Sequence, residues 1–189
     1  MDLTKLEIWK TEDEIRQAVI ECADKLTTRF KDSEERVVFL CLIKGGVMFY
    51  TDLCKYCDIE LLEMQFLAAK SYGQKMESTG DVAIVGTNEL KISGKHVVIV
   101  DDIYDTGLTM SAVAHRLKSF SPKSVSACTL FKKPYPKATY FNPAKVAEQL
   151  NLVYGIIANE NDFLIGYGLD YDQLYRNLHQ VYRVDKTQE

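Results

Sequence analysis

Residues 97–110 read VVIVDDIYDTGLTM, and their pattern is the clearest indication of the fold. Its first four residues are branched and apolar, as in a strand that is buried on both faces of a parallel sheet. The acidic, glycine-containing loop that follows leads into a helical pattern from about Met110 to Lys118. A strand, a loop and a helix in this order form the repeating unit of a sheet that is covered by helices.

The same succession extends in both directions along the chain. Val37–Ile43 is a second continuous apolar run, and a helical pattern follows it to about Tyr56. Thr11 and Glu14 form a capping box ahead of an amphipathic helix over about 12–30. Further strand candidates are Leu61–Ala69, Val82–Val85, Ser124–Phe131 and Val153–Ile157.

The composition agrees with one globular unit. The chain has 189 residues, of which 47% are hydrophobic and 26% are charged, and domains usually contain about 100–200 residues. We therefore expect a single α/β domain over residues 1–189, with a twisted, mainly parallel sheet flanked by helices. The aromatic, loop-rich segment of about 141–189 is expected to join the N-terminal segment in a small hood.

Charge and cysteine content narrow the class of protein. The net charge of −4 speaks against a broad nucleic-acid interface, which usually has an excess of Lys and Arg. No apolar run approaches the ~18 residues of a membrane span, and the first residues lack the features of a signal peptide. Five cysteines, an odd number, favour reduced thiols. We expect a cytoplasmic protein that binds neither membrane nor nucleic acid.

Residues 105–109, DTGLT, form a predicted phosphate-binding loop. Successive backbone amides at a helix N-terminus can point into one concavity, and Gly107 lets the chain turn and approach a ligand closely. The loop lacks the GxxxxGK[ST] pattern of a Walker loop. Asp101 and Asp102 lie just upstream and suit sugar hydroxyls or Mg²⁺ better than phosphate. The competing interpretation, a solvated acidic turn, is disfavoured by the apolar strand before these acids.

Five blocks in the same order resemble one enzyme family. Residues 97–110 resemble the phosphoribosyl diphosphate signature of the type I phosphoribosyltransferases. The blocks similar to hypoxanthine–guanine phosphoribosyltransferases are FLCLIKGGVMFYTDL (39–53), KSYGQKMESTGDVAIVG (70–86), LFKKP (130–134) and FLIGYGLDYDQLYRNL (163–178). The resemblance implies purine salvage with Mg²⁺. The 5-phosphoribosyl group would pass from phosphoribosyl diphosphate to N9 of hypoxanthine or guanine, giving IMP or GMP and pyrophosphate.

The resemblance assigns the phosphoribosyl diphosphate site to three segments. Residues 105–109 would hold the 5′-phosphate. Lys44 and Gly45 would contact the pyrophosphate, with a non-proline cis peptide bond between Ile43 and Lys44, and Arg176 would be a further pyrophosphate contact. The residues implied at this site are Lys44, Gly45, Asp101, Asp102, Asp105, Thr106, Gly107, Leu108, Thr109 and Arg176.

The resemblance also assigns catalysis, metal binding and closure. Asp105 would be the general acid and base beside N7 of the purine. Ser71 and Tyr72 would begin a loop that closes over the site and excludes water. The implied Mg²⁺ ligands are Asp101 and Asp102 beside the ribose and Asp170 for a second ion.

The purine site falls near the C-terminal end by the same resemblance. Lys132 would donate to O6 of the base, Phe163 would stack on the ring, and Leu164 would offer backbone groups to the base edge. A cation at O6 favours an oxo group over the amino group of adenine, which would place donor against donor.

Two departures from the family pattern bear on the choice of base. Most hypoxanthine–guanine enzymes have Glu-Asp where this chain has Asp101-Asp102, and Asp-Asp also occurs in xanthine-preferring relatives. The segment between Tyr140 and Phe163 is longer than the usual hood. This hood carries Glu160 and Asp162, without Lys or Arg over residues 146–175, and so offers few donors to the C2 oxygen of xanthine. We expect hypoxanthine and guanine to be preferred.

Two alternatives stay open at this point. One is a xanthine-preferring phosphoribosyltransferase, and the other is a nucleotide-binding regulator on the same fold that binds RNA or DNA. The acidic charge and the complete set of Asp105, Lys132 and Asp170 disfavour the regulator. The expected partners are the purine, phosphoribosyl diphosphate and, because relatives are dimers or tetramers, further copies of the chain.

Overall fold

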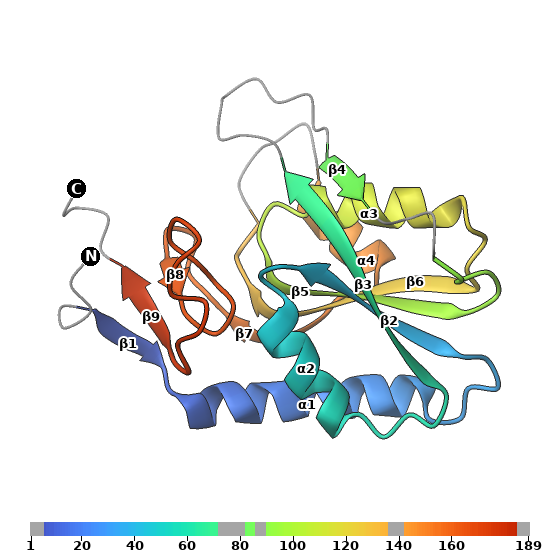
Figure 1. Cartoon of the computed structure of the whole chain (residues 1–189), viewed down its shortest axis with the longest axis horizontal. Helices are drawn as coiled ribbons and strands as arrows, with labels where there is room; N and C mark the ends of the chain where they lie inside the picture. Colours follow the sequence, from blue (N-terminus) through green and yellow to red (C-terminus); the bar gives the residue numbers. More distant parts are fainter. Residues whose placement is uncertain (1–5, 72–81, 86–89, 136–141, 185–189) are drawn as a thin grey trace.

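The computed structural model describes residues 6–71, 82–85, 90–135 and 142–184. Strands and helices alternate along them, and most strands assemble into one sheet with helices on both faces (Figure 1). None of the helices in these ranges is long and apolar enough to cross a membrane. The elements in chain order are β1 (Glu7–Lys10), α1 (Glu12–Phe30), β2 (Val37–Ile43), α2 (Val47–Tyr56), β3 (Leu62–Ser71), β4 (Val82–Val85), β5 (His96–Tyr104), α3 (Leu108–Lys118), β6 (Ser124–Lys132), α4 (Pro143–Gln149), β7 (Val153–Ile157), β8 (Phe163–Ile165) and β9 (Val181–Val184).

The main sheet has six strands in the order β4-β3-β2-β5-β6-β7. From β3 to β7 along this order the strands are parallel, and β4 pairs with β3 in the antiparallel sense at one edge. The expected twisted, mainly parallel α/β sheet is confirmed. Since these strands are parallel, the loops after β2, β5, β6 and β7 all leave from the carboxyl ends of the strands. Ligands bind at this end of the strands in open α/β sheets.

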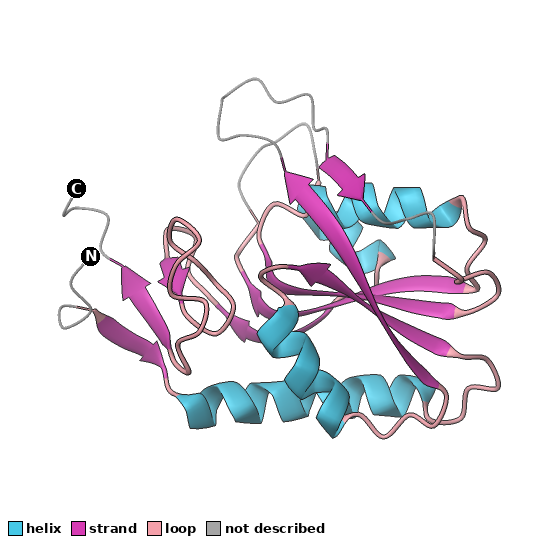
Figure 2. Cartoon of the chain, viewed as in Figure 1, coloured by secondary structure: helices cyan, strands magenta, loops and turns pink. Residues whose placement is uncertain are grey.

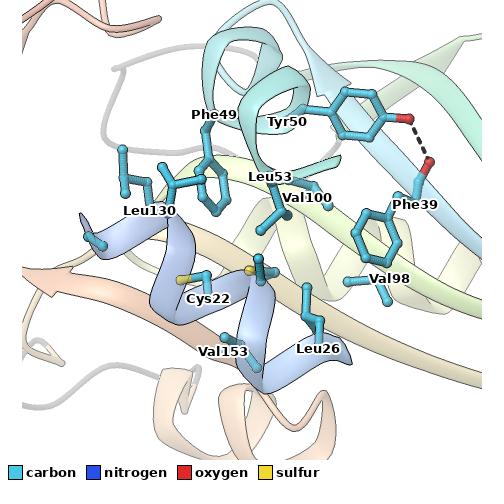
Figure 3. Packing of buried hydrophobic residues seen from close by; sticks show 14 of the residues in the cluster. Cys22, Leu26, Phe39, Phe49, Tyr50, Leu53, Val98, Val100, Leu130 and Val153 are labelled. Carbon is cyan, nitrogen blue, oxygen red and sulfur yellow. Dashed lines mark hydrogen bonds between the residues drawn. The ribbon is translucent and has the colours of Figure 1, made fainter. Parts of the chain in front are cut away.

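Alternate residues of the central strands face two separate cores. Phe39 and Cys41 of β2 pack with α1 and α2, whereas Val38 and Leu40 pack with α3 and α4. Figure 2 shows these helices on the two sides of the sheet, and Figure 3 shows the core beneath α1 and α2. There the buried Tyr50 hydroxyl donates a hydrogen bond to the Phe39 carbonyl at 3.0 Å. Burial on both faces explains the uninterrupted apolar run of β2.

A second, three-stranded sheet joins the two ends of the described chain. Its order is β1-β9-β8, with antiparallel pairing that places Glu7 opposite Arg183 and Phe163 opposite Val184. Figure 1 shows this small sheet beside the N-terminal end of α1. Residues 143–157 form α4 and β7, and β7 extends the main sheet by pairing with β6. This corrects the hood boundary expected at about 141, because the hood's C-terminal strands begin only at Phe163.

The structure departs from the sequence expectations at several elements. α3 begins at Leu108, two residues earlier than expected, because Gly107 already serves as its N-cap. β3 continues to Ser71 because its last four residues pair with β4. α4 was not expected, although its start carries ordinary signals: Asn142 caps the first turn through its side chain, and Pro143 occupies the first position.

The five cysteines are free thiols in the core that α1 and α2 cover. Burial raises the pKa of Cys41 to about 12 and the pKa of Cys54 to about 11. Thiols of such high pKa are weak nucleophiles, because the thiolate is the reactive form. Cys54 and Cys57, which are spaced as a CxxC motif, therefore contribute to packing.

α1 begins with the capping box that the sequence predicts. The Thr11 hydroxyl accepts a hydrogen bond from the Glu14 backbone N–H at 3.3 Å, and the Glu14 carboxylate accepts one from the Thr11 backbone N–H at 2.9 Å. The hydrogen bond from Lys10, followed by those from Thr11, lowers the pKa of Glu14 to about 2. These contacts satisfy amides that a helix start otherwise leaves without acceptors.

We expect Thr11→Ala to lower the free energy of unfolding by about 1 kcal/mol, the usual loss when a Thr cap becomes Ala. Urea unfolding at neutral pH measures the change. Thr28→Ala is the matched control, because Thr28 is exposed in the same helix and caps nothing. An equal loss of stability in the two variants would contradict the role given to the capping box.

Candidate active site

The loop between β5 and α3 has the shape of an anion-binding nest. Gly107 has a φ of 77°, which side chains rarely adopt, and a Cβ there would overlap the Tyr104 hydroxyl. Tyr104 is buried, and its hydroxyl donates to the Pro143 carbonyl at 2.7 Å. Tyr104 therefore supports the loop from beneath, a role that sequence reasoning missed.

The polar side of this loop faces solvent. Asp105, Thr106 and Leu108 are exposed. The Ser111 amide donates to the Gly107 carbonyl at 2.9 Å, so the amides before it belong to the first turn, which has no helical acceptors for them. These amides and the Thr106 hydroxyl can together bind an anion such as phosphate.

Asp101 and Asp102 form a crowded pair of carboxylates just before the nest. Burial raises the pKa of both groups, and the negative charge of Asp102 raises that of Asp101 further. The Asp102 amide donates to Asp101 Oδ1 at 3.0 Å, and the Ile103 amide donates to Asp102 Oδ1 at 2.7 Å. Concentrated negative charge of this kind suits a divalent cation or sugar hydroxyls.

The turn after β2 lies against this acidic pair. The peptide bond between Ile43 and Lys44 is cis, as predicted. A Cβ on Gly45 would overlap the Asp102 carboxylate, and a Cβ on Gly168 would overlap the Gly45 carbonyl. Glycine is therefore required at both positions for the β2 turn, the Asp102 side chain and the hood loop to approach one another.

The structure pairs two of the expected site residues with each other. Asp170 Oδ1 lies 2.6 Å from Arg176 Nη2, and Arg176 Nη1 donates to the Gly168 carbonyl at 2.7 Å. The positive charge of Arg176 also opposes the rise in the pKa of Asp102, so the guanidinium lies near the acidic pair. Within the described ranges, no three His, Cys, Asp or Glu side chains gather around one point.

Two lysines at the end of β6 have different surroundings. Lys132 Nζ lies 4.3 Å from the centre of the Tyr135 ring and 4.7 Å from that of Tyr154. Lys133 Nζ lies 3.7 Å from Asp105 Oδ2. Lys133 directly follows the last residue of β6 and faces Asp105 of the nest, whereas Lys132 lies against the two tyrosine rings. Sequence reasoning missed Lys133.

The expected aromatic of the purine site lies on β8. The Phe163 ring packs edge to face against Tyr171, with centroids 5.8 Å apart, and Leu164 is buried. Ser71 is the last residue of β3 and lies at the carboxyl ends of the parallel strands, where the nest loop also begins. Tyr72 and the rest of the expected closing loop to residue 81 lie outside the described residues.

The hood is less acidic than its sequence indicates. Asp162 Oδ1 lies 2.9 Å from Arg183 Nε, and Asp162 Oδ2 accepts from Arg183 Nη2 at 3.4 Å. Residues 146–175 contain no Lys or Arg, but Arg183 follows them in the sequence. Its guanidinium compensates one of the two acids, which corrects the view of an acidic hood without cations.

The sequence of this chain matches a known protein family. The family profile described as "Phosphoribosyl transferase domain" matches residues 9–172. The chain belongs to this phosphoribosyltransferase family. The matched range includes the nest of the phosphoribosyltransferase, the Asp101–Asp102 pair, Lys132 and Phe163.

Individual relatives match this phosphoribosyltransferase over most of its length. The hypoxanthine phosphoribosyltransferase of Salmonella typhimurium is 37% identical over 179 residues, 95% of each chain. The enzyme of that name from Buchnera aphidicola is 36% identical over 174 residues, 92% of this chain and 93% of that one. A hypoxanthine-guanine-xanthine phosphoribosyltransferase of Tritrichomonas foetus is 36% identical over 167 residues, 88% of this chain and 85% of that one.

Solved structures share the fold of the phosphoribosyltransferase. A hypoxanthine phosphoribosyltransferase of Staphylococcus aureus superposes with a TM-score of 0.81 at 29% identity, covering 99% of each chain. The hypoxanthine phosphoribosyl transferase of Trypanosoma cruzi gives a TM-score of 0.80 at 32% identity, covering 95% of this chain and 91% of that one. The type I phosphoribosyltransferase fold expected from the sequence is thus confirmed.

Proposed function

We propose that this phosphoribosyltransferase transfers the 5-phosphoribosyl group of phosphoribosyl diphosphate to N9 of hypoxanthine or guanine. The products are IMP or GMP and pyrophosphate, so the enzyme salvages preformed purines. The observation that carries the proposal is that three groups lie together at the carboxyl ends of the main-sheet strands. These groups are the nest at 105–109, the Asp101–Asp102 pair and Lys132. The names of relatives with 36–37% identity support the same reaction.

In this proposal the nest holds the 5′-phosphate, and Asp101 with Asp102 faces the ribose hydroxyls. N9 attacks ribose C1 while the bond to pyrophosphate breaks, so positive charge develops on the ribose and negative charge on the leaving group. Preorganised charges opposite those that develop lower such a barrier. Lys44 and Arg176 are the cations assigned to the pyrophosphate.

The base is proposed to lie between the nest and the hood. Asp105 exchanges a proton with the purine beside N7, Lys132 donates to O6, and Phe163 stacks on the ring. Leu164 contributes its backbone groups to the base edge. Asp105 is well placed for proton exchange because its side chain is 55% exposed and Lys133 lies 3.7 Å from it.

The proposal includes Mg²⁺. Asp101 and Asp102 fit one ion as oxygen ligands, because their charges are crowded together, and Asp170 is the proposed ligand of a second Mg²⁺. Mg²⁺ commonly takes only one or two carboxylates and completes its shell with substrate oxygens and water. When bound, the ion supplies charge neutralisation for the departing pyrophosphate.

Hypoxanthine and guanine are proposed as preferred bases over xanthine. The acidic pair is assigned to the ribose, so it does not contact the group at C2 of the base. With Asp162 compensated by Arg183, the remaining support is Glu160 and the names of the relatives. The Tritrichomonas relative, whose name includes xanthine, makes a xanthine-preferring enzyme the alternative to test.

One assay tests both the reaction and the base. The protein is incubated with phosphoribosyl diphosphate, Mg²⁺ and each of hypoxanthine, guanine, xanthine and adenine, and the nucleotides are separated and quantified. We expect IMP and GMP, with little product from adenine, and a rate that falls when EDTA is added. A kcat/KM for xanthine at or above that for guanine contradicts the preference, and no nucleotide from any base contradicts the function.

The finer statements on assembly and location are also proposals. We propose a homodimer or homotetramer, because Met64 and Phe66 of β3 are 50% and 51% exposed on the sheet face that α1 and α2 cover elsewhere. Parallel sheets are usually covered on both faces, so a second copy fits there. Sedimentation equilibrium tests this, and a mass of 21.6 kDa alone contradicts it.

The core of free thiols supports the expected cytoplasmic location.

A further inference from the structure

The proposed purine site draws its two sides from different sheets. Lys132 ends β6 of the main sheet, whereas Phe163 begins β8 of the small sheet. The distance between an O6 donor and a stacking ring affects affinity for the base, because contacts that are already in place need not be ordered when the base binds. Contacts between the two sheets therefore bear directly on how the base is held.

One connection runs along the chain. The Ala158 amide donates to the Lys132 carbonyl at 2.9 Å, which fixes where the chain leaves the main sheet. A turn follows in which the Asp162 amide donates to the Asn159 carbonyl at 3.2 Å, while the Asn159 amide donates to Asp162 Oδ2 at 2.9 Å. The turn therefore closes on the Asp162 carboxylate, immediately before Phe163.

A second connection runs through side chains. Phe131, the residue before Lys132, packs on Trp9 of β1 with ring centroids 5.6 Å apart. The Arg183 guanidinium lies over the same Trp9 ring, 5.9 Å from its centre. From there Arg183 reaches Asp162 through the contacts at 2.9 and 3.4 Å described above. Both connections thus end on the Asp162 carboxylate, which is only 8% exposed.

We propose that Arg183 is a positioning residue that sets Phe163 opposite Lys132 and so controls affinity for the base. This inference rests on the proposed purine site. Adjacent strand residues point to opposite sides, so Asp162 and Arg183 act through Phe163 without touching the base. Arg183 supplies the charge that a nearly buried carboxylate needs, and Trp9 fixes the guanidinium against the main sheet.

The first test is Arg183→Ala in the full chain. We expect the KM for hypoxanthine to rise roughly tenfold, equivalent to about 1.4 kcal/mol, with kcat and the KM for phosphoribosyl diphosphate changed less than about twofold. Arg183→Lys keeps a cation and is expected to recover most of the loss. Lys10→Ala is the matched control, since Lys10 also lies over Trp9 but pairs with Glu14, and it should leave every constant unchanged.

A double variant separates positioning from simple charge compensation. Arg183→Met with Asp162→Asn removes the unpaired buried carboxylate, so the Tm that falls in Arg183→Ala should recover. The KM for hypoxanthine should stay raised, because the tie between the sheets is still absent. A KM that recovers together with the Tm overturns the inference, as does an unchanged KM in Arg183→Ala. Nucleotide formation by the wild-type protein tests the proposed function separately from either outcome.

Discussion

Asp105→Asn is expected to lower kcat by roughly 10²–10⁴-fold, the usual contribution of a general acid or base. Asn keeps the size of the side chain and its ability to hydrogen bond, but it cannot exchange a proton with the purine. The backbone amides of the nest remain, so the KM for phosphoribosyl diphosphate should change less than about threefold, given that backbone donors dominate such nests.

Steady-state kinetics with hypoxanthine at neutral pH measure this effect. Asp32→Asn is the matched control: Asp32 is an exposed aspartate that precedes β2, at the opposite end of the strands from the nest. It should leave kcat unchanged. A kcat for Asp105→Asn within threefold of the wild type would remove Asp105 from the catalytic role. A large rise in the KM for phosphoribosyl diphosphate would instead assign the carboxylate to ligand binding.

Lys132→Ala is expected to lower kcat/KM for hypoxanthine roughly tenfold to a hundredfold. This corresponds to the loss of a charged hydrogen bond to O6, worth about 1.5–3 kcal/mol. The faces of Tyr135 and Tyr154 already hold the ammonium in place, at 4.3 and 4.7 Å, so little reorganisation is needed when the base binds.

Adenine serves as the internal comparison for this variant. Its amino group does not accept a hydrogen bond from Lys132, so kcat/KM for adenine should not fall, and selection of oxopurines should weaken. Lys145→Ala, an exposed lysine on α4, controls for loss of surface charge. If Lys132→Ala retains wild-type kcat/KM for hypoxanthine, the O6 contact lies elsewhere.

The elements of the main sheet were predictable because their signals are local and strong. Val37–Ile43 and the first residues of β5 are apolar without interruption, which only strands buried on both faces require. Thr11 and Glu14 mark the start of α1 within four residues of sequence. The nest was predictable for the same reason, since its strand, its glycine and its helix are contiguous.

The hood was expected to combine both ends of the chain, but the strands of its small sheet could not be predicted because their pairing is not local. β1, β8 and β9 contain only three or four residues each, and β1 pairs with β9 from the other end of the chain. Strands this short show too few residues for a period to appear. Their register comes from tertiary packing, including the contact of Trp9 with Phe131.

Contacts between side chains that are far apart in the sequence could not be predicted either. The family resemblance assigned Lys132 and Asp105, but it did not reveal that Lys133 faces Asp105. The expectation of a hood without cations was wrong because Asp162 and Arg183 are neighbours only through the antiparallel pairing of β8 with β9. Charge compensation depends on distance in space, which a sequence window does not measure.

The pairing of β1 with β9 sets an order on folding during translation. β1 leaves the ribosome first, yet β9 emerges only after every strand of the main sheet. Synthesis proceeds at about 5–20 residues per second, so the nascent main sheet has time to form before β9 is available to pair with β1. A nascent chain can therefore form the loop at 105–109 before the small sheet, and a premature stop ahead of β9 would leave the loop without that sheet.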